Sequence, residues 1–79
     1  MRDLTNYALD GYDAPSGAQP EYALGSSAHV AWLVGRWLAE NGGIRPQLVT
    51  SEVGYAVRVD GVKVEVPAGA TGTPRIVSD

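Results

Sequence analysis

The dipeptide Asp60-Gly61 joins two short segments in which apolar and polar residues alternate. A two-residue turn between antiparallel strands needs positive φ angles at both positions, and Asp followed by Gly is among the best sequences for it. The sequence therefore predicts a β-hairpin with strands over 55–59 and 62–66. In this register one face of the hairpin is apolar. The pairs on that face are Val59 with Val62, Val57 with Val64, and Tyr55 with Val66.

The opposite face of the predicted hairpin is polar, with Arg58 opposite Lys63 and Ala56 opposite Glu65. Like charges that face each other are mildly destabilising, so an acid is expected nearby. Glu65 on the diagonal, an acidic part of the chain or an acidic partner could each supply it. Segment 47–51 reads as a further strand, joined to the hairpin through a short connection that contains Gly54.

A helix is predicted before the sheet, over 26–43. Ser26 or Ser27 suits the N-cap, and the Gly42-Gly43 pair suits the C-terminal stop. Apolar residues recur with the spacing of a core-facing helix. These residues are Val30, Leu33, Val34, Trp37 and Leu38.

The other side of this helix is unusual, because Trp32 lies there beside His29 and Arg36. A strip of small residues, Ala28, Gly35 and Ala39, runs alongside. Small residues next to a large aromatic ring let another backbone approach closely. We therefore expect this side to be covered, either by the N-terminal part of the chain or by a second molecule.

The first 25 residues carry the whole negative balance of the chain. They hold four acids against one base, whereas 26–66 and 67–79 are each neutral. The same segment holds three of the four tyrosines, and its glycines and prolines disfavour a long helix or a central strand. We expect an irregular acidic arm over 1–25, with one short helical turn near its start.

Together these elements predict an α+β fold in one domain of 79 residues. An irregular arm (1–25) precedes one amphipathic helix (26–43), which packs on a three-stranded antiparallel meander (46–67). The tail, 68–79, is expected to be loop, in which only 75–77 could add a short edge strand. A chain of this size without cysteine has no disulfide to support its core, so marginal stability or a stabilising partner is expected.

The sequence contains no pattern that specifies a catalytic, metal or cofactor site. His29 is the only histidine and has no nucleophile motif around it, so a surface or partly packed role is expected. Asp10, Asp13 and Glu21 lack the spacing of a calcium loop. We therefore predict a protein that is not an enzyme and that needs no cofactor or metal.

Direct nucleic-acid binding is the weaker expectation, because six basic residues against nine acids provide few phosphate contacts. Arg58 and Lys63 on the open sheet face form the candidate patch, and its ordinary interpretation is a solvated sheet surface. The longest apolar run is too short to cross a bilayer, and the N-terminus lacks a signal-peptide pattern, so a cytoplasmic protein without membrane contact is expected.

Protein binding is the leading hypothesis, because tyrosine supplies rigid contact area and acids steer toward a basic surface. The alternative is that the tyrosines anchor the arm to its own helix. The predicted contact residues are Tyr7, Asp10, Tyr12, Asp13, Glu21, Tyr22, Trp32 and Arg36.

In its size, acidity and lack of catalytic motifs, the chain resembles the small inhibitors made by phages and mobile elements, including anti-CRISPR proteins. The resemblance implies that it obstructs a larger protein or nucleoprotein complex that handles nucleic acid, by steric blocking with electrostatic help. A second hypothesis is a structural or regulatory homo-oligomer, such as a homodimer, in which Trp32 and the strip of small residues form a helix contact.

Overall fold

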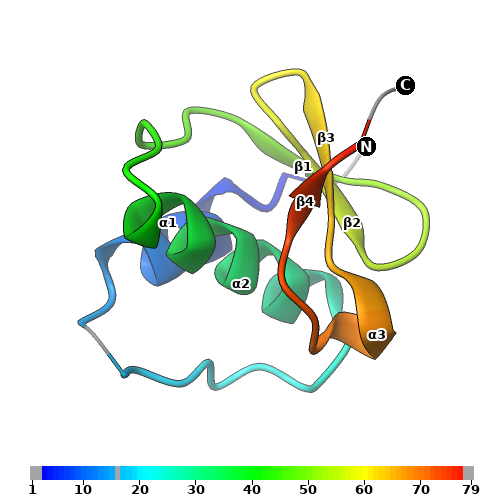
Figure 1. The fold of residues 1–79 in the computed structure, drawn as a ribbon, viewed down its shortest axis with the longest axis horizontal. Helices are drawn as coiled ribbons and strands as arrows, with labels where there is room; N and C mark the ends of the chain where they lie inside the picture. The colour runs from blue at the N-terminus through cyan, green and yellow to red at the C-terminus, as the bar shows by residue number, and fades with distance from the viewer. Residues whose placement is uncertain (1–2, 16, 78–79) are drawn as a thin grey trace.

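The computed structural model describes residues 3–15 and 17–77. They form an α+β fold with a four-stranded antiparallel sheet in the order β1-β2-β3-β4. The elements are α1 (Thr5–Asp13), α2 (Ser27–Glu40), β1 (Val49–Ser51), β2 (Ala56–Val59), β3 (Val62–Glu65), α3 (Pro67–Ala70) and β4 (Arg75–Ile76) (Figure 1).

The N-terminal segment is not the irregular arm that we expected, because nine of its residues form α1. The side chain of Asp3 accepts hydrogen bonds from the backbone N–H (2.9 Å) and the hydroxyl (2.6 Å) of Thr5, which satisfies a donor at the start of the helix. Gly11 lies inside α1 despite its low helix propensity. Tertiary packing outweighs that propensity, as described below.

α2 begins and ends close to where the sequence predicts. The Ser26 hydroxyl accepts a hydrogen bond from the His29 N–H (3.1 Å), and Gly42 has a φ angle of 71° just past the last turn. Val30 and Val34 are buried in the core, and Leu33, Trp37 and Leu38 pack against it. The predicted core-facing stripe of the helix is confirmed.

The hairpin of β2 and β3 has the predicted register, and its turn has φ angles of 48° at Asp60 and 90° at Gly61. β1 pairs with β2, with Val49 opposite Val59. The acid beside Arg58 is Glu52 (3.2 Å), whereas Glu65 pairs with Arg75 (2.7 Å). Of the acids that the sequence left open for Arg58 and Lys63, Glu65 has Arg75 of β4 as its described ion-pair partner.

The tail is more ordered than the expected loop. It forms the short helix α3 and the strand β4, which pairs with β3 through Val64↔Ile76 and Glu65↔Arg75. The sheet therefore has four strands and not three. The edge strand that the sequence allowed at 75–77 is present as Arg75–Ile76.

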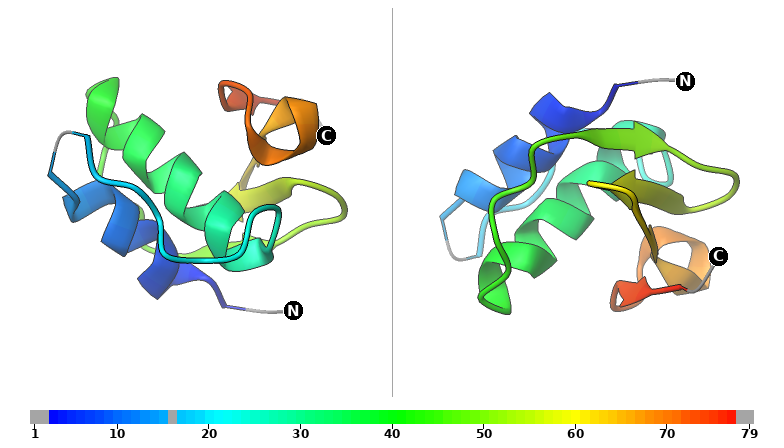
Figure 2. Two further views of the ribbon diagram at one scale, coloured as in Figure 1. Left: turned by 90° about the horizontal axis from the view of Figure 1, so that it is seen from below. Right: turned by 90° about the horizontal axis from the view of Figure 1, so that it is seen from above.

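The two long helices lie side by side and run in the same direction. The chain between them, described over residues 17–26 and named the returning segment, runs back along the pair (Figure 2). The α3–β4 segment lies on the opposite side of α2 from α1. Valines of the sheet form the core with Leu4, which precedes α1, and with residues of both helices, among them Ala8 and Val34. α2 therefore has α1, the sheet and the α3–β4 segment as neighbours, and cavities form along it between these neighbours. No described helix is long and apolar enough to span a bilayer.

Candidate functional site

The N-terminal segment covers the side of α2 that carries the small residues, which is one of the two alternatives that the sequence leaves open. A Cβ atom on Gly35 would lie 1.9 Å from the carbonyl oxygen of Ala8, and one on Gly11 would lie 2.0 Å from the carbonyl oxygen of Trp32. Each helix therefore uses a glycine to accept the other helix's backbone. Residues with any side chain at these positions would force α1 and α2 apart.

Two of the arm tyrosines pack on each other. The rings of Tyr7 and Tyr22 meet edge to face, with centroids 5.1 Å apart and an interplanar angle of 83°. The Tyr22 hydroxyl donates to Asp10 Oδ2 (2.8 Å), and this hydrogen bond raises the pKa of Tyr22 above its ordinary value. The contact joins the returning segment to α1.

The third tyrosine fixes the end of α1 to the region after α2. The Tyr12 hydroxyl donates to the carbonyl oxygen of Gly43 (2.9 Å), and the Arg45 guanidinium lies 5.7 Å from the centre of the Tyr12 ring. Arg45 also binds both carboxylate oxygens of Asp13. This pairing lowers the pKa of Asp13 and raises that of Arg45. Tyr12 and Asp13 are thus engaged within the chain.

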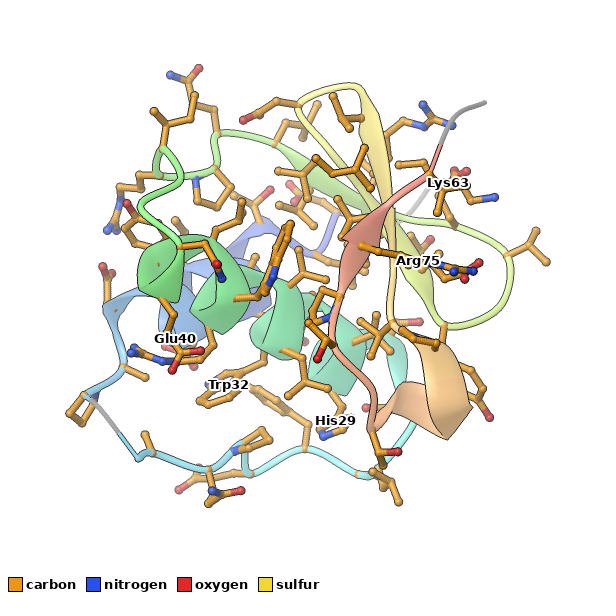
Figure 3. The ribbon with its side chains drawn as sticks, viewed as in Figure 1. His29, Trp32, Glu40, Lys63 and Arg75 are labelled. Carbon is orange, nitrogen blue, oxygen red and sulfur yellow. The ribbon has the colours of Figure 1, made fainter. Side chains whose placement is uncertain are left out.

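Arg36 is another anchor of the arm. Its guanidinium donates to the carbonyl oxygen of Ala14 and lies 3.4 Å from a carboxylate oxygen of Glu40. Trp32 is 6% exposed and lies beneath the returning segment, toward which its side chain points from α2 (Figure 3). A helix contact with a second copy through Trp32 would first require the arm to leave.

Asp10 and Glu21 are the two predicted contact acids that no described base neutralises. They lie at one small cavity of about 160 Å³ between α1, the returning segment and α2, which we name the arm pocket. Its lining consists of Asp10, Ala14, Ala18, Gln19, Glu21, Tyr22 and Trp32. The arm pocket thus gathers four of the predicted contact residues.

Trp32 adds a hydrogen-bond donor at the arm pocket. Among the described residues its indole N–H has no acceptor, and the nitrogen is not sealed from solvent. A buried aromatic residue normally satisfies this N–H with a partner. The pocket therefore offers two carboxylates and one neutral donor, which a ligand with a cation and a carbonyl group would satisfy together.

The second group of predicted contact residues lies elsewhere. Lys63 and Arg75 point outward from the sheet, away from the helices (Figure 3). Arg58 donates to the carbonyl oxygen of Gly61 (3.0 Å) and to Glu52, so acids and carbonyl groups already accompany this face. Arg58 and Arg75 therefore each have an acidic partner on this face.

The sequence predicted neither of two larger cavities. A cavity of about 470 Å³ lies between α2, the returning segment and the α3–β4 connection, and His29 lines it. An apolar groove of about 340 Å³ lies between the end of α2 and the β3–β4 edge, with Ile44 and Ile76 exposed beside it. No local signal shows either cavity, because each forms from segments distant in the sequence.

The described residues contain no group of three or more His, Asp or Glu side chains close enough to hold a metal ion. Comparison of the chain with protein-family models, with curated proteins and with solved structures finds no match.

Proposed function

We propose that this chain is a non-enzymatic protein-binding module, and that the arm pocket receives a basic side chain from a larger partner. The observation that carries the proposal is the gathering of Asp10 and Glu21, the two unneutralised contact acids, over the buried Trp32. The other charged residue of α1 after its first turn, Asp13, is neutralised by Arg45.

The size of the arm pocket limits the ligand. Pockets for drug-sized molecules are about 300 Å³ or larger, and the arm pocket is about 160 Å³. It suits the head of one Lys or Arg side chain. Arginine fits better, because its planar guanidinium pairs with carboxylates at two points and stacks on aromatic rings. The backbone carbonyl next to that arginine supplies an acceptor for the Trp32 indole N–H.

The geometry favours a partner with a basic surface, as we expected from the charge distribution. The resemblance to anti-CRISPR proteins implies an inhibitory role. In that role Asp10 and Glu21 form ion pairs with basic side chains of the partner, which are then no longer able to bind phosphate. The tyrosines then act indirectly, because Tyr7, Tyr12 and Tyr22 hold the arm against α2 and so form the pocket wall.

Fluorescence polarisation with a labelled nonapeptide that contains arginine tests this proposal. A second peptide has glutamine at the arginine positions. The arginine peptide should bind, and the glutamine peptide should bind roughly tenfold more weakly or not at all, since a hydrogen bond between charged groups contributes about 1.5–3 kcal/mol.

Two variants with the same change in net charge locate the binding. Glu21→Gln removes an arm-pocket acid that has no described partner, whereas Glu65→Gln removes an acid on the sheet face. We expect Glu21→Gln to weaken binding of the arginine peptide roughly fivefold or more, and Glu65→Gln to have little effect on that binding. Equal losses in the two variants would show that net charge attracts the peptide, which would contradict the proposal.

A further inference from the structure

The cavity that His29 lines is separate from the arm pocket and follows one side of α2. It extends from His29 near the start of the helix to Glu40 at its end, a length of about 16 Å at 1.5 Å per residue. Pro20 and Leu24 of the returning segment form one wall, and Pro74 lies in the other. Its volume, about 470 Å³, is within the range of small-molecule sites.

One end of this cavity holds a buried histidine, of which one ring nitrogen has a partner among the described residues and the other has none. His29 is 6% exposed, and its Nδ1 accepts a hydrogen bond from the Gly25 N–H (3.3 Å). The neutral ring therefore carries its proton on Nε2. Nε2 has no acceptor among the described residues and is not sealed from solvent. Since His29 lines the cavity, its free N–H is a donor offered to whatever occupies it.

The electrostatics of this end favour a negative acceptor. His29 lies in the first turn of α2, where the helix dipole is positive. Glu40, the acid that lines the cavity, lies at the opposite end of the helix and pairs with Arg36 (3.4 Å). A negative group beside His29 is therefore far from the cavity's carboxylate.

Apolar side chains line this cavity beside polar ones. Leu33 and Trp37 follow His29 at intervals of four residues, which places all three on one side of α2. Leu24 and the two prolines face them from the walls. An aryl or alkyl group in this stretch would lie along Leu33 and Trp37 while its head group stays at His29.

We propose that this cavity binds a small organic carboxylate, with the carboxylate accepting the His29 Nε2–H and an apolar tail lying along Leu33 and Trp37. The proposal is independent of the arm pocket, because neither Asp10 nor Glu21 lines this cavity.

NMR titration tests the proposal directly, since the chain has a single histidine and its ring nitrogen signals are unambiguous. The probes are 4-phenylbutanoate and its uncharged counterpart 4-phenylbutan-1-ol, added to ¹⁵N-labelled protein. The acid should shift the His29 ring signals with a Kd on the order of 1 mM, as expected for about a dozen heavy atoms. The alcohol should bind roughly tenfold more weakly.

Two variants of the histidine separate a ligand contact from a structural role. His29→Asn keeps an oxygen that can accept the Gly25 N–H but lacks a donor at the Nε2 position, so it should abolish the preference for the acid. His29→Gln, whose amide reaches the Nε2 position, should restore part of it. The backbone amide spectrum shows whether each variant is folded.

Three results would overturn the proposal. The first is an unchanged His29 signal at saturating acid. The second is equal binding of acid and alcohol by the wild-type chain. The third is perturbation confined to the amides of Ile44, Val62 and Ile76, which would place the probe in the apolar groove instead.

Discussion

Replacing Gly35 by alanine should separate the two long helices and destabilise the protein. The added Cβ would lie 1.9 Å from the Ala8 carbonyl oxygen and 2.8 Å from the Ala8 carbonyl carbon. An ordinary contact begins at 3.4 Å, so the shortfall to the oxygen is about 1.5 Å. Both atoms belong to the backbone of α1, so no side-chain rotation relieves the clash.

The free-energy cost follows from two opposing effects. Overpacking of this kind typically costs about 1–3 kcal/mol, and a backbone clash belongs at the upper end. Alanine in place of glycine returns about 1 kcal/mol through its higher helix propensity. The net loss should be about 2 kcal/mol, which lowers Tm by roughly 8–16 °C in a domain of this size.

Thermal and urea unfolding followed by circular dichroism measure the loss. Gly11→Ala creates the reciprocal clash with the Trp32 carbonyl oxygen at 2.0 Å and should cost a similar amount. Because either variant already parts the helices, the double variant should lose less than the sum of the single losses. An unchanged or higher midpoint for Gly35→Ala, as expected of a solvent-exposed helix, would refute the close contact.

Three further outcomes are expected. The ion pair with Arg45 lowers the pKa of Asp13 in the folded protein. The pair therefore stabilises the fold fully above the ordinary aspartate pKa of about 3.9, and this contribution is lost as the pH falls through the lowered pKa of Asp13. Arg45→Gln should reduce this acid loss in urea midpoints measured against pH, and an unchanged slope would contradict the pairing. The hydrogen bond to Asp10 raises the pKa of Tyr22, so this phenol should ionise at higher pH than an ordinary tyrosine in an alkaline absorbance titration. Asp10→Asn should move the ionisation of Tyr22 to lower pH, and an unaltered titration would exclude the hydrogen bond between Tyr22 and Asp10. Gly61 has a φ angle of 90°, which an alanine side chain disfavours even though open space surrounds the position. Gly61→Ala should therefore lower the free energy of unfolding by roughly 1–2 kcal/mol. An unaffected urea midpoint would show that the turn is not as described.

The hairpin and α2 were predicted correctly because residues within or next to each element determine its turn or its ends. The Asp60-Gly61 turn fixes the hairpin register, and Ser26 with Gly42 fixes the ends of α2. Only one short helical turn was predicted where α1 forms, because glycine and aspartate lower the intrinsic helix propensity of its sequence, whereas the stability of α1 depends on its packing against α2. The signal that could have revealed it is the spacing of Ala8 and Gly11, three residues apart and matching the small-residue strip of α2.

The candidate site was predictable in composition but not in arrangement. Tyrosines, acids and Trp32 were identified from residue type, since these residues are typical of contact surfaces. Which acid remains available depends on tertiary neighbours, because Arg45 reaches Asp13 from 32 residues away and leaves Asp10 and Glu21 unneutralised. His29 was assigned only a surface or partly packed role for the same reason, since the walls of its cavity come from both ends of the chain.

The most direct test of the protein-binding proposal follows the indole N–H signals of the two tryptophans during titration with the capped tripeptide acetyl-Gly-Arg-Gly-amide. A Trp37→Phe variant assigns the two signals. The arm pocket predicts that the Trp32 signal moves, that the Trp37 signal stays, and that the Asp10→Asn/Glu21→Gln double variant loses the shift. A stationary Trp32 signal, or a shift that survives in the double variant, would contradict the proposal.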